Sequence, residues 1–276
     1  NNAAAAGADM VVIWNNTTGT ISMSTPGQAA VPAYSIQQTP GQAIANFVDA
    51  NPTTATMDFD LIPSQGDVLA DFSLRGPTQS PLEDLQKPNI TGPGVGIYAA
   101  VADPTQYGNL SGTSMSSPHV AGAATLVRQA QPDWDPMEVK SAMQMTATGD
   151  AGTKEDGTTA WDWDDVGSGR VDLTAAALSG LVMVETTANF LAANPGAGGD
   201  VKTLNLPSVR DRSCSPSCTF TRTVSAGQAF PTSWSVTTSA RGGDMQIEVT
   251  PTSFTLDARS DMIFADGLED TPIPVP

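Results

Sequence analysis

The feature that most constrains this chain is the stretch of residues 112–122, which reads GTSMSSPHVAG. It continues into residues 123–127, AATLV, so the segment is small or apolar on every side of a helix. A helix of that kind belongs inside a sizeable core. Ser114 is therefore expected where a loop meets a buried helix, beside the free N–H groups and positive dipole end of the helix N-terminus. Negative charge developing on a substrate oxygen would be stabilised at that position.

Two other interpretations of this stretch explain less of it. A nucleophile elbow between a strand and a helix needs Gly-x-Ser-x-Gly, and this chain has Ser116 in the last place, which excludes the elbow. A small-residue turn before a buried helix would account for Gly112 and Ser116 without any chemistry. That turn would leave the rest of the stretch unexplained, so a catalytic segment is favoured.

The stretch resembles the nucleophile segment of the subtilisin-like serine proteases, and the resemblance implies that Ser114 is the catalytic nucleophile. Residues 72–77 (FSLRGP) and 87–95 (KPNITGPGV) resemble two further blocks of this family that precede the nucleophile. Residues 167–172 (GSGRVD) resemble the block that closes its catalytic domain. The chain departs from the family at Leu74, where Ser is usual, at Asn89, where Asp is usual, and at Gly92, where Ala is usual. None of these positions is the nucleophile, so the fold expectation stands.

The expected catalytic triad is incomplete in this sequence. A serine hydroxyl is a weak nucleophile and needs a base that a third group orients. His119 is the only histidine and lies five residues after Ser114 on the same predicted helix, so the two side chains point about 140° apart. His119 therefore cannot be the base, and we expect it to be a satisfied core side chain.

The family order of catalytic residues is Asp, His, Ser, and no Asp here stands in the family's setting. Asn109 does not match the place of the asparagine that completes the family's oxyanion hole, so that role is not assigned to it. The backbone N–H of Ser114 is the one oxyanion donor that the resemblance supplies. The base, the orienting acid and the second donor are expected from a missing N-terminal half of the catalytic domain.

The resemblance implies a doubly wound α/β domain with a parallel sheet, and residues 60–180 are expected to be its C-terminal part. Residues 1–59 resemble part of an α/β protease-associated domain, on the patterns at 5–16 and 31–36. Residues 181–268 are expected to form a small β-sandwich, and the proline-containing residues 269–276 a disordered tail. With only part of the sheet present, the central helix would leave an apolar side exposed and demand a partner.

Local patterns predict the individual elements of the first 180 residues. A helix is expected to end within residues 1–8, and strands are expected at 10–14, 31–36 and 95–101. Thr39 and Gln42 have capping-box spacing around Pro40, which predicts a helix that residues 43–48 continue. Asp135 and Pro136 mark the start of another helix. The helical spacing of Val139, Ala142, Met143 and Thr146 continues that helix.

Beyond residue 180, strands are predicted at 219–224, 233–238, 245–250 and 253–256. The only cysteines, Cys214 and Cys218, flank a turn at Pro216, which favours a disulfide and an oxidising, extracytoplasmic compartment. Two free thiols or half a metal site are the alternatives, and a four-ligand zinc site lacks the other ligands.

Charge narrows the possible partners. The net charge is −17 with a pI near 4.1, so nucleic acid and anionic membrane surfaces are poor partners. No apolar run approaches the roughly 18 residues needed to span a bilayer. Asp162, Asp164 and Asp165 could offer oxygens to calcium, but without the spacing of a known calcium loop a solvated acidic turn is favoured. No cofactor is assigned, and calcium stays possible.

The leading hypothesis is a secreted serine endopeptidase that cleaves protein or peptide substrates through an acyl-enzyme formed on Ser114. This chain would carry the nucleophile only and be inactive alone. One alternative is a non-catalytic relative that binds peptides. The other is a stable fragment with a structural role.

Overall fold

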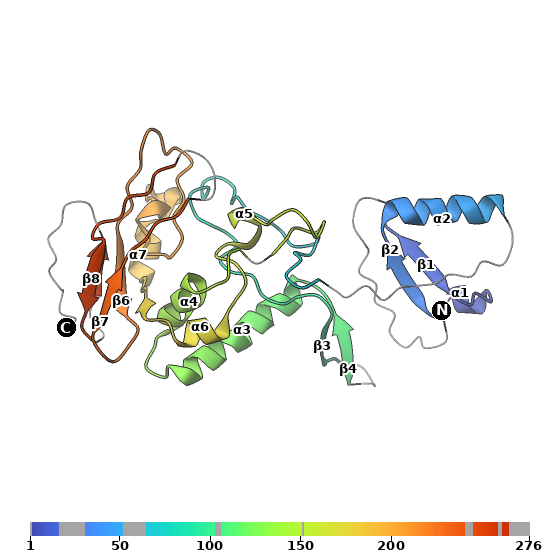
Figure 1. Ribbon diagram of the computed structural model, residues 1–276, viewed down its shortest axis with the longest axis horizontal. Helices are drawn as coiled ribbons and strands as arrows, with labels where there is room; N and C mark the ends of the chain where they lie inside the picture. Colours follow the sequence, from blue (N-terminus) through green and yellow to red (C-terminus); the bar gives the residue numbers. More distant parts are fainter. Residues whose placement is uncertain are drawn as a thin grey trace. The chain divides into compact units, whose positions relative to one another are not determined.

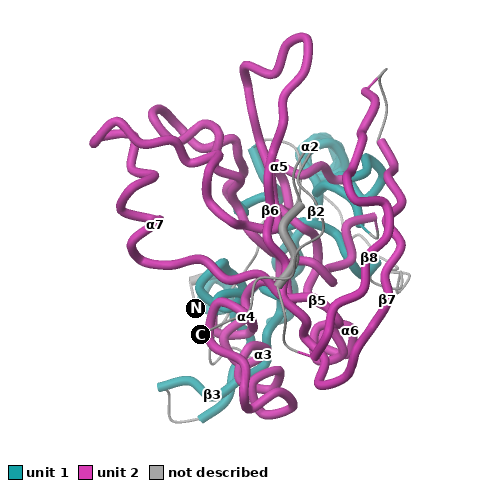
Figure 2. Tube along the Cα trace, turned by 90° about the vertical axis from the view of Figure 1, so that its left-hand side faces the viewer, with its two compact units in different colours: residues 1–73, 93–117, 152–160 teal, residues 74–92, 118–151, 161–276 magenta. Residues whose placement is uncertain are grey.

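The computed structural model describes residues 2–16, 31–51, 65–102, 106–150, 152–240, 245–258 and 261–264 (Figure 1). The chain divides into two compact units, which Figure 2 shows in different colours. Unit 1 contains residues 1–73, 93–117 and 152–160, and unit 2 contains residues 74–92, 118–151 and 161–276. Each unit is described by itself below.

Unit 1 begins with a small α/β element. Helix α1 (Asn2–Ala5) is followed by strand β1 (Val11–Trp14), which pairs in parallel with β2 (Ala33–Ile36). Helix α2 (Gln38–Ala50) lies along β1, as Figure 1 shows. The contact is close because Gly41 is buried on the ring of Trp14, and a Cβ at Gly41 would lie 2.3 Å from Trp14 Cβ. The predictions of two strands and a helix here are confirmed.

The predicted start of helix α2 is wrong by two residues. The helix begins at Gln38, its N-cap is Gln37 without a side-chain hydrogen bond, and Thr39 lies inside the first turn. Pro40 is tolerated there because the first backbone N–H groups of a helix have no intrahelical acceptor. A capping box at Thr39 is therefore not formed.

The segment before the Ser114 stretch is a two-stranded antiparallel ladder. Strand β3 (Ile97–Ala100) pairs with β4 (Tyr107–Leu110), so that Tyr98 lies opposite Asn109. The rings of Tyr98 and Tyr107 stack with their centroids 5.8 Å apart. The predicted strand at 95–101 is confirmed over its middle. Among the described residues of 60–180, β3 and β4 are the only strands, so no parallel sheet is seen there.

Helix α3 (Thr113–Ala130) carries the Ser114 stretch and runs without a break through Pro118. Only Ala123 and Val127 are buried along it, while Leu126 is 56% exposed. The expectation of a helix enclosed in a core is therefore wrong for the described residues. The expectation that part of its apolar surface would face solvent is confirmed, because Leu126 is more than half exposed.

The main core of unit 2 forms where α3 meets α4 (Pro136–Met145) and α6 (Leu173–Ala177). Ala123 and Val127 pack there with the buried side chains Trp134, Val139, Ala142, Met143, Ala176 and Val182. Asp135 caps α4 with a full capping box: its side chain accepts from the N–H groups of Met137 and Glu138, and Glu138 accepts from the N–H of Asp135. The predicted start and core side of α4 are confirmed.

The C-terminal part of unit 2 holds two antiparallel sheets. Strand β6 (Arg222–Ala226) pairs with β5 (Leu181–Val182) and with β9 (Asp261–Phe264). Strand β7 (Thr232–Ser235) pairs with β8 (Ser253–Leu256). Side chains of β6 and β8 share a core around Val224, Phe254 and Leu256.

The strand predictions in this part are confirmed in three of their four places. Residues 245–250 are described and form no strand, because Met245 and Ile247 are exposed and have no core to face. Helix α7 (Thr187–Ala192) and two short 3-10 helices, η1 (Pro195–Ala197) and η2 (Val201–Thr203), were not predicted. Whether the two sheets make a sandwich domain stays a prediction, and the tail at 269–276 lies outside the described residues.

The predicted disulfide is confirmed: Cys214 and Cys218 are bonded, with their Cα atoms 5.2 Å apart. Within the part of the chain that the structure describes, no helix has both the length and the apolar character to cross a membrane.

The cap of α4 gives a direct stability test. Asp135→Ala removes an acceptor from two N–H groups, so we expect the free energy of unfolding to fall by about 1 kcal/mol. Urea denaturation followed by tryptophan fluorescence measures the change, since Trp134 is 1% exposed in the adjoining core. Asp133→Ala is the matched control, because Asp133 is exposed and caps no helix. Equal stability of the two variants would contradict the cap assignment.

Candidate active site

Ser114 lies in the first turn of α3, and its side chain is exposed. The turn before it is made by Gly112, whose φ of +157° is in the range that favours glycine. The carbonyl of Gly112 accepts from the N–H groups of Met115 and Ser116 at 3.0 and 3.2 Å. No hydrogen bond to Ser114 is seen among the described residues, so its hydroxyl and its backbone N–H are both open to a ligand.

The turn before Ser114 is hydrogen-bonded to the backbone of Gly94. The N–H of Gly112 donates to the carbonyl of Gly94 at 2.8 Å, and the neighbouring Gly96 N–H donates to Ser111 Oγ at 2.8 Å. A Cβ at Gly94 would lie 3.0 Å from Gly112 O and 3.1 Å from Ser116 Cβ. A side chain at residue 94 would therefore fit only if this turn shifted by a few tenths of an ångström.

The other polar residues named from the sequence are not brought to Ser114. His119 is exposed on α3, so the expectation of a satisfied core histidine is wrong: its side of the helix has no cover in the described structure. Asn109 is exposed on β4. No hydrogen bond joins Ser114 to His119 or Asn109 in the described part of the chain. The site is thus an exposed hydroxyl at the N-terminus of a long helix.

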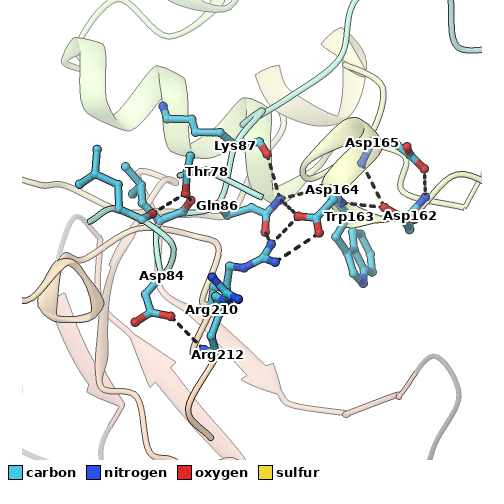
Figure 3. Close-up of polar contacts among 12 residues, drawn as sticks. Thr78, Asp84, Gln86, Lys87, Asp162, Trp163, Asp164, Asp165, Arg210 and Arg212 are labelled. Carbon is cyan, nitrogen blue, oxygen red and sulfur yellow. Dashed lines mark hydrogen bonds and ion pairs between the residues drawn. The ribbon is translucent and has the colours of Figure 1, made fainter. Parts of the chain in front are cut away.

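The acidic turn at 162–165 is built differently from the expected solvated turn (Figure 3). Asp162 caps the short helix α5 (Trp163–Val166), with Asp165 completing a capping box. Asp165 is 3% exposed and forms an ion pair with Arg75, Nε to Oδ1, at 3.3 Å. The Asp164 carboxylate accepts hydrogen bonds from both terminal nitrogens of Arg210, from Nη1 and, at 3.2 Å, from Nη2. The expectation of solvated carboxylates is wrong for Asp164 and Asp165, each of which pairs with an arginine, while Asp162 is exposed as expected.

Gln86 completes this cluster. Its Nε2 donates to Trp163 O at 2.7 Å, and its Oε1 accepts from Arg210 Nη1 at 3.1 Å. Sequence reasoning missed the cluster because Arg210 lies 46 and 124 residues from Asp164 and Gln86. No local pattern signals such contacts. Among the described residues, no group of three or more His, Cys, Asp or Glu side chains could hold a metal ion.

An exposed serine hydroxyl whose own backbone N–H is open at a helix N-terminus is compatible with a nucleophile that attacks a carbonyl. Comparison with known proteins agrees with this class. The sequence profile of the subtilase family matches residues 4–169, more than half of the chain. The chain belongs to the subtilase family.

The relatives that the chain matches are proteases by name. The chain is 36% identical over 152 residues to the minor extracellular protease Vpr of Bacillus subtilis, covering 53% of this chain and 18% of that protein. It is 37% identical over 156 residues to the CO(2)-response secreted protease of Arabidopsis thaliana, covering 51% and 20%. It is 32% identical over 216 residues to the subtilisin-like protease SBT1.7 of the same plant, covering 69% and 28%. The chain thus spans less than a third of the length of each of these relatives.

The replacement of the family's usual Asp by Asn89 leaves Lys87 without a carboxylate at this contact. Lys87 Nζ donates to Asn89 Oδ1 at 2.6 Å, and Asn89 is neutral where the family usually has Asp. Burial, and then the charge of Lys140, hold the pKa of Lys87 below its ordinary value of 10.5. A lysine whose pKa is lowered by folding binds fewer protons in the folded state, so its contribution to stability rises with pH up to about 10.5.

The two glycines that flank the site differ in the space around them, which gives a paired test. Gly94→Ala should lower the free energy of unfolding by about 1 kcal/mol or more and shift the amide resonances of residues 112–116, because its Cβ would crowd Gly112 O. Gly122→Ala in α3 meets nothing within 4 Å and should raise stability by about 0.5–1 kcal/mol. Equal effects in urea denaturation and NMR would contradict the close approach at Gly94.

The Lys87 pair gives a test by titration. Asn89→Asp would place a carboxylate at the Lys87 ammonium, so we expect the Lys87 pKa to rise toward or above its ordinary value. NMR titration of the lysine side chain measures this pKa directly. Asn109→Asp, the same change on exposed strand β4, should leave the Lys87 pKa unchanged. A Lys87 pKa that stays unchanged in Asn89→Asp would contradict the contact between Lys87 and residue 89.

Proposed function

We propose that this chain is part of a secreted subtilisin-like serine endopeptidase and supplies its nucleophile, Ser114. The observation that carries the proposal is the exposed Ser114 hydroxyl in the first turn of α3, next to a backbone N–H that no described group uses. In this mechanism Ser114 attacks the scissile carbonyl of a protein or peptide substrate. The Ser114 N–H is one donor to the oxyanion, and the acyl-enzyme is then hydrolysed by water.

The remaining catalytic groups come, in this proposal, from an N-terminal half of the catalytic domain that is not part of the sequence. Two features support this assignment: no imidazole approaches Ser114 in the described structure, and α3 exposes Leu126 on an uncovered side. A second set of elements packed on that side would bury the exposed apolar surface. Residues 60–180 are then the C-terminal part of a doubly wound parallel-sheet domain, and residues 1–59 and 181–268 a partial protease-associated domain and a β-sandwich.

A secreted location is part of the same proposal. The disulfide between Cys214 and Cys218 supports it, because structural disulfides are typical of oxidising compartments. Two of the relatives carry the words extracellular or secreted in their names. The high negative charge disfavours nucleic acid as a partner.

The test is made in the complete protein. Ser114→Ala should reduce peptide hydrolysis by a factor of about 10³ or more while leaving thermal unfolding unchanged, because Ser114 is exposed. Ser117→Ala is the matched control, since Ser117 is exposed on the same helix, and it should keep full activity. Unchanged hydrolysis in Ser114→Ala would overturn the assignment and favour a non-catalytic, peptide-binding relative.

A further inference from the structure

The ladder of β3 and β4, which leads directly into α3 (Figure 1), is regular up to its last pair on that side. This last pair is Ile97 opposite Leu110. At the other end of the ladder, the N–H of Val101 donates to the carbonyl of Gln106 at 3.1 Å. Hydrogen-bonded pairs recur at every second residue of an antiparallel ladder, so Ile97 and Leu110 form such a pair as well.

The next hydrogen bond toward α3 slips by one residue. The regular register would join the N–H of Gly112 to the carbonyl of Val95, but this N–H donates to the carbonyl of Gly94 at 2.8 Å. The segment before β3 therefore contains one extra residue. Gly96, at the slip, has a φ of +61°, in the left-handed region that favours glycine. An extra residue beside a left-handed glycine is the pattern of a β-bulge, and bulges next to active sites re-aim the side chains that follow.

The hydroxyl of Ser111 is bonded to this bulge. The N–H of Gly96 takes no part in the ladder and donates to Ser111 Oγ at 2.8 Å. Ser111 immediately precedes Gly112, whose carbonyl accepts the first N–H groups of α3. A hydrogen bond that favours the slipped register over the regular one therefore also fixes where the first turn of α3 begins.

We propose that Ser111 is a positioning residue for the nucleophile: its hydroxyl stabilises the bulge at Gly96 and, through Gly112, the place of Ser114. This inference rests on the proposed function, because it concerns the reactivity of Ser114. A strand rises about 3.3 Å per residue, so a return to the regular register would move the turn at Gly112 by about that distance. A misplacement of about 1 Å is enough to cost about 10²-fold in rate.

The experiment measures peptide hydrolysis by the complete protein, with active sites counted by complete labelling with a fluorophosphonate. Ser111→Ala should lower kcat per labelled site about fivefold or more, because the regular register then competes with the slipped one. KM should stay within about twofold, since the hydroxyl acts through the backbone and not on the substrate. A merely structural role would lower the number of labelled sites and leave kcat per site unchanged.

The conservative variant separates the hydroxyl from the rest of the side chain. Ser111→Thr keeps an acceptor for the N–H of Gly96 and should retain kcat per labelled site within about twofold. An unchanged kcat per site in Ser111→Ala would overturn the proposal, as would an equal loss of kcat in Ser111→Thr and Ser111→Ala.

Gly96 and Gly7 give a matched pair for the bulge itself. Both have a positive φ, +61° and +80°, and a Cβ at either position would meet nothing within 4 Å. Gly96→Ala and Gly7→Ala should therefore lower thermal stability to a similar extent. Only Gly96→Ala should also lower kcat per labelled site, because Gly7 lies outside the bulge. An equal kcat per site in the two variants would refute the role of the bulge.

The failure of this inference is distinguishable from the failure of the proposed function. Activity that survives in Ser114→Ala overturns the proposed function and this inference with it. Activity that is lost in Ser114→Ala but keeps its full kcat per site in Ser111→Ala overturns only the positioning role of Ser111.

Discussion

The turn at Gly112 is the constraint on which the site depends. Its carbonyl accepts two N–H groups from the start of α3, and its N–H is held by Gly94. That arrangement leaves Ser114 in the first helical turn with its hydroxyl outward. The backbone contact between Gly94 and Gly112 therefore helps to fix where Ser114 lies.

Helix α3 links this turn to the core of unit 2. Ala123 and Val127 anchor one side of the helix among the buried side chains of α4 and α6. The other side, with Leu126, is exposed. A helix anchored on one side only is well suited to hold a serine in place for a second set of elements. This arrangement agrees with the proposal that the chain carries the nucleophile and that other elements supply the remaining catalytic groups.

Sequence reasoning succeeded where the information is local. Asp135 and Pro136 predicted the start of α4, and the spacing of Cys214 and Cys218 predicted the disulfide. It failed where distant residues decide. The acidic turn at 162–165 was expected to be solvated, but Arg75 and Arg210 cover two of its carboxylates. Thr39 was expected to cap α2, but α2 extends back to Gln38.

The candidate site was predictable only in part, for the same reason. The stretch at 112–122 identified Ser114 and the helix that follows it, because both depend on adjacent residues. The exposure of His119 was not predictable, since it depends on which elements cover α3. The cluster of Gln86, Asp164 and Arg210 gave no signal, because its members come from three separate parts of the chain.

The central claim is that Ser114 is positioned as a nucleophile but lacks an activating base in this chain. Labelling by a fluorophosphonate probe, located by peptide mass spectrometry, tests it most directly, because the probe reacts with activated serine hydroxyls. The account predicts rapid labelling of Ser114 in the complete protein and negligible labelling in this chain alone. Rapid labelling of Ser114 in this chain alone, or no labelling in the complete protein, would contradict it.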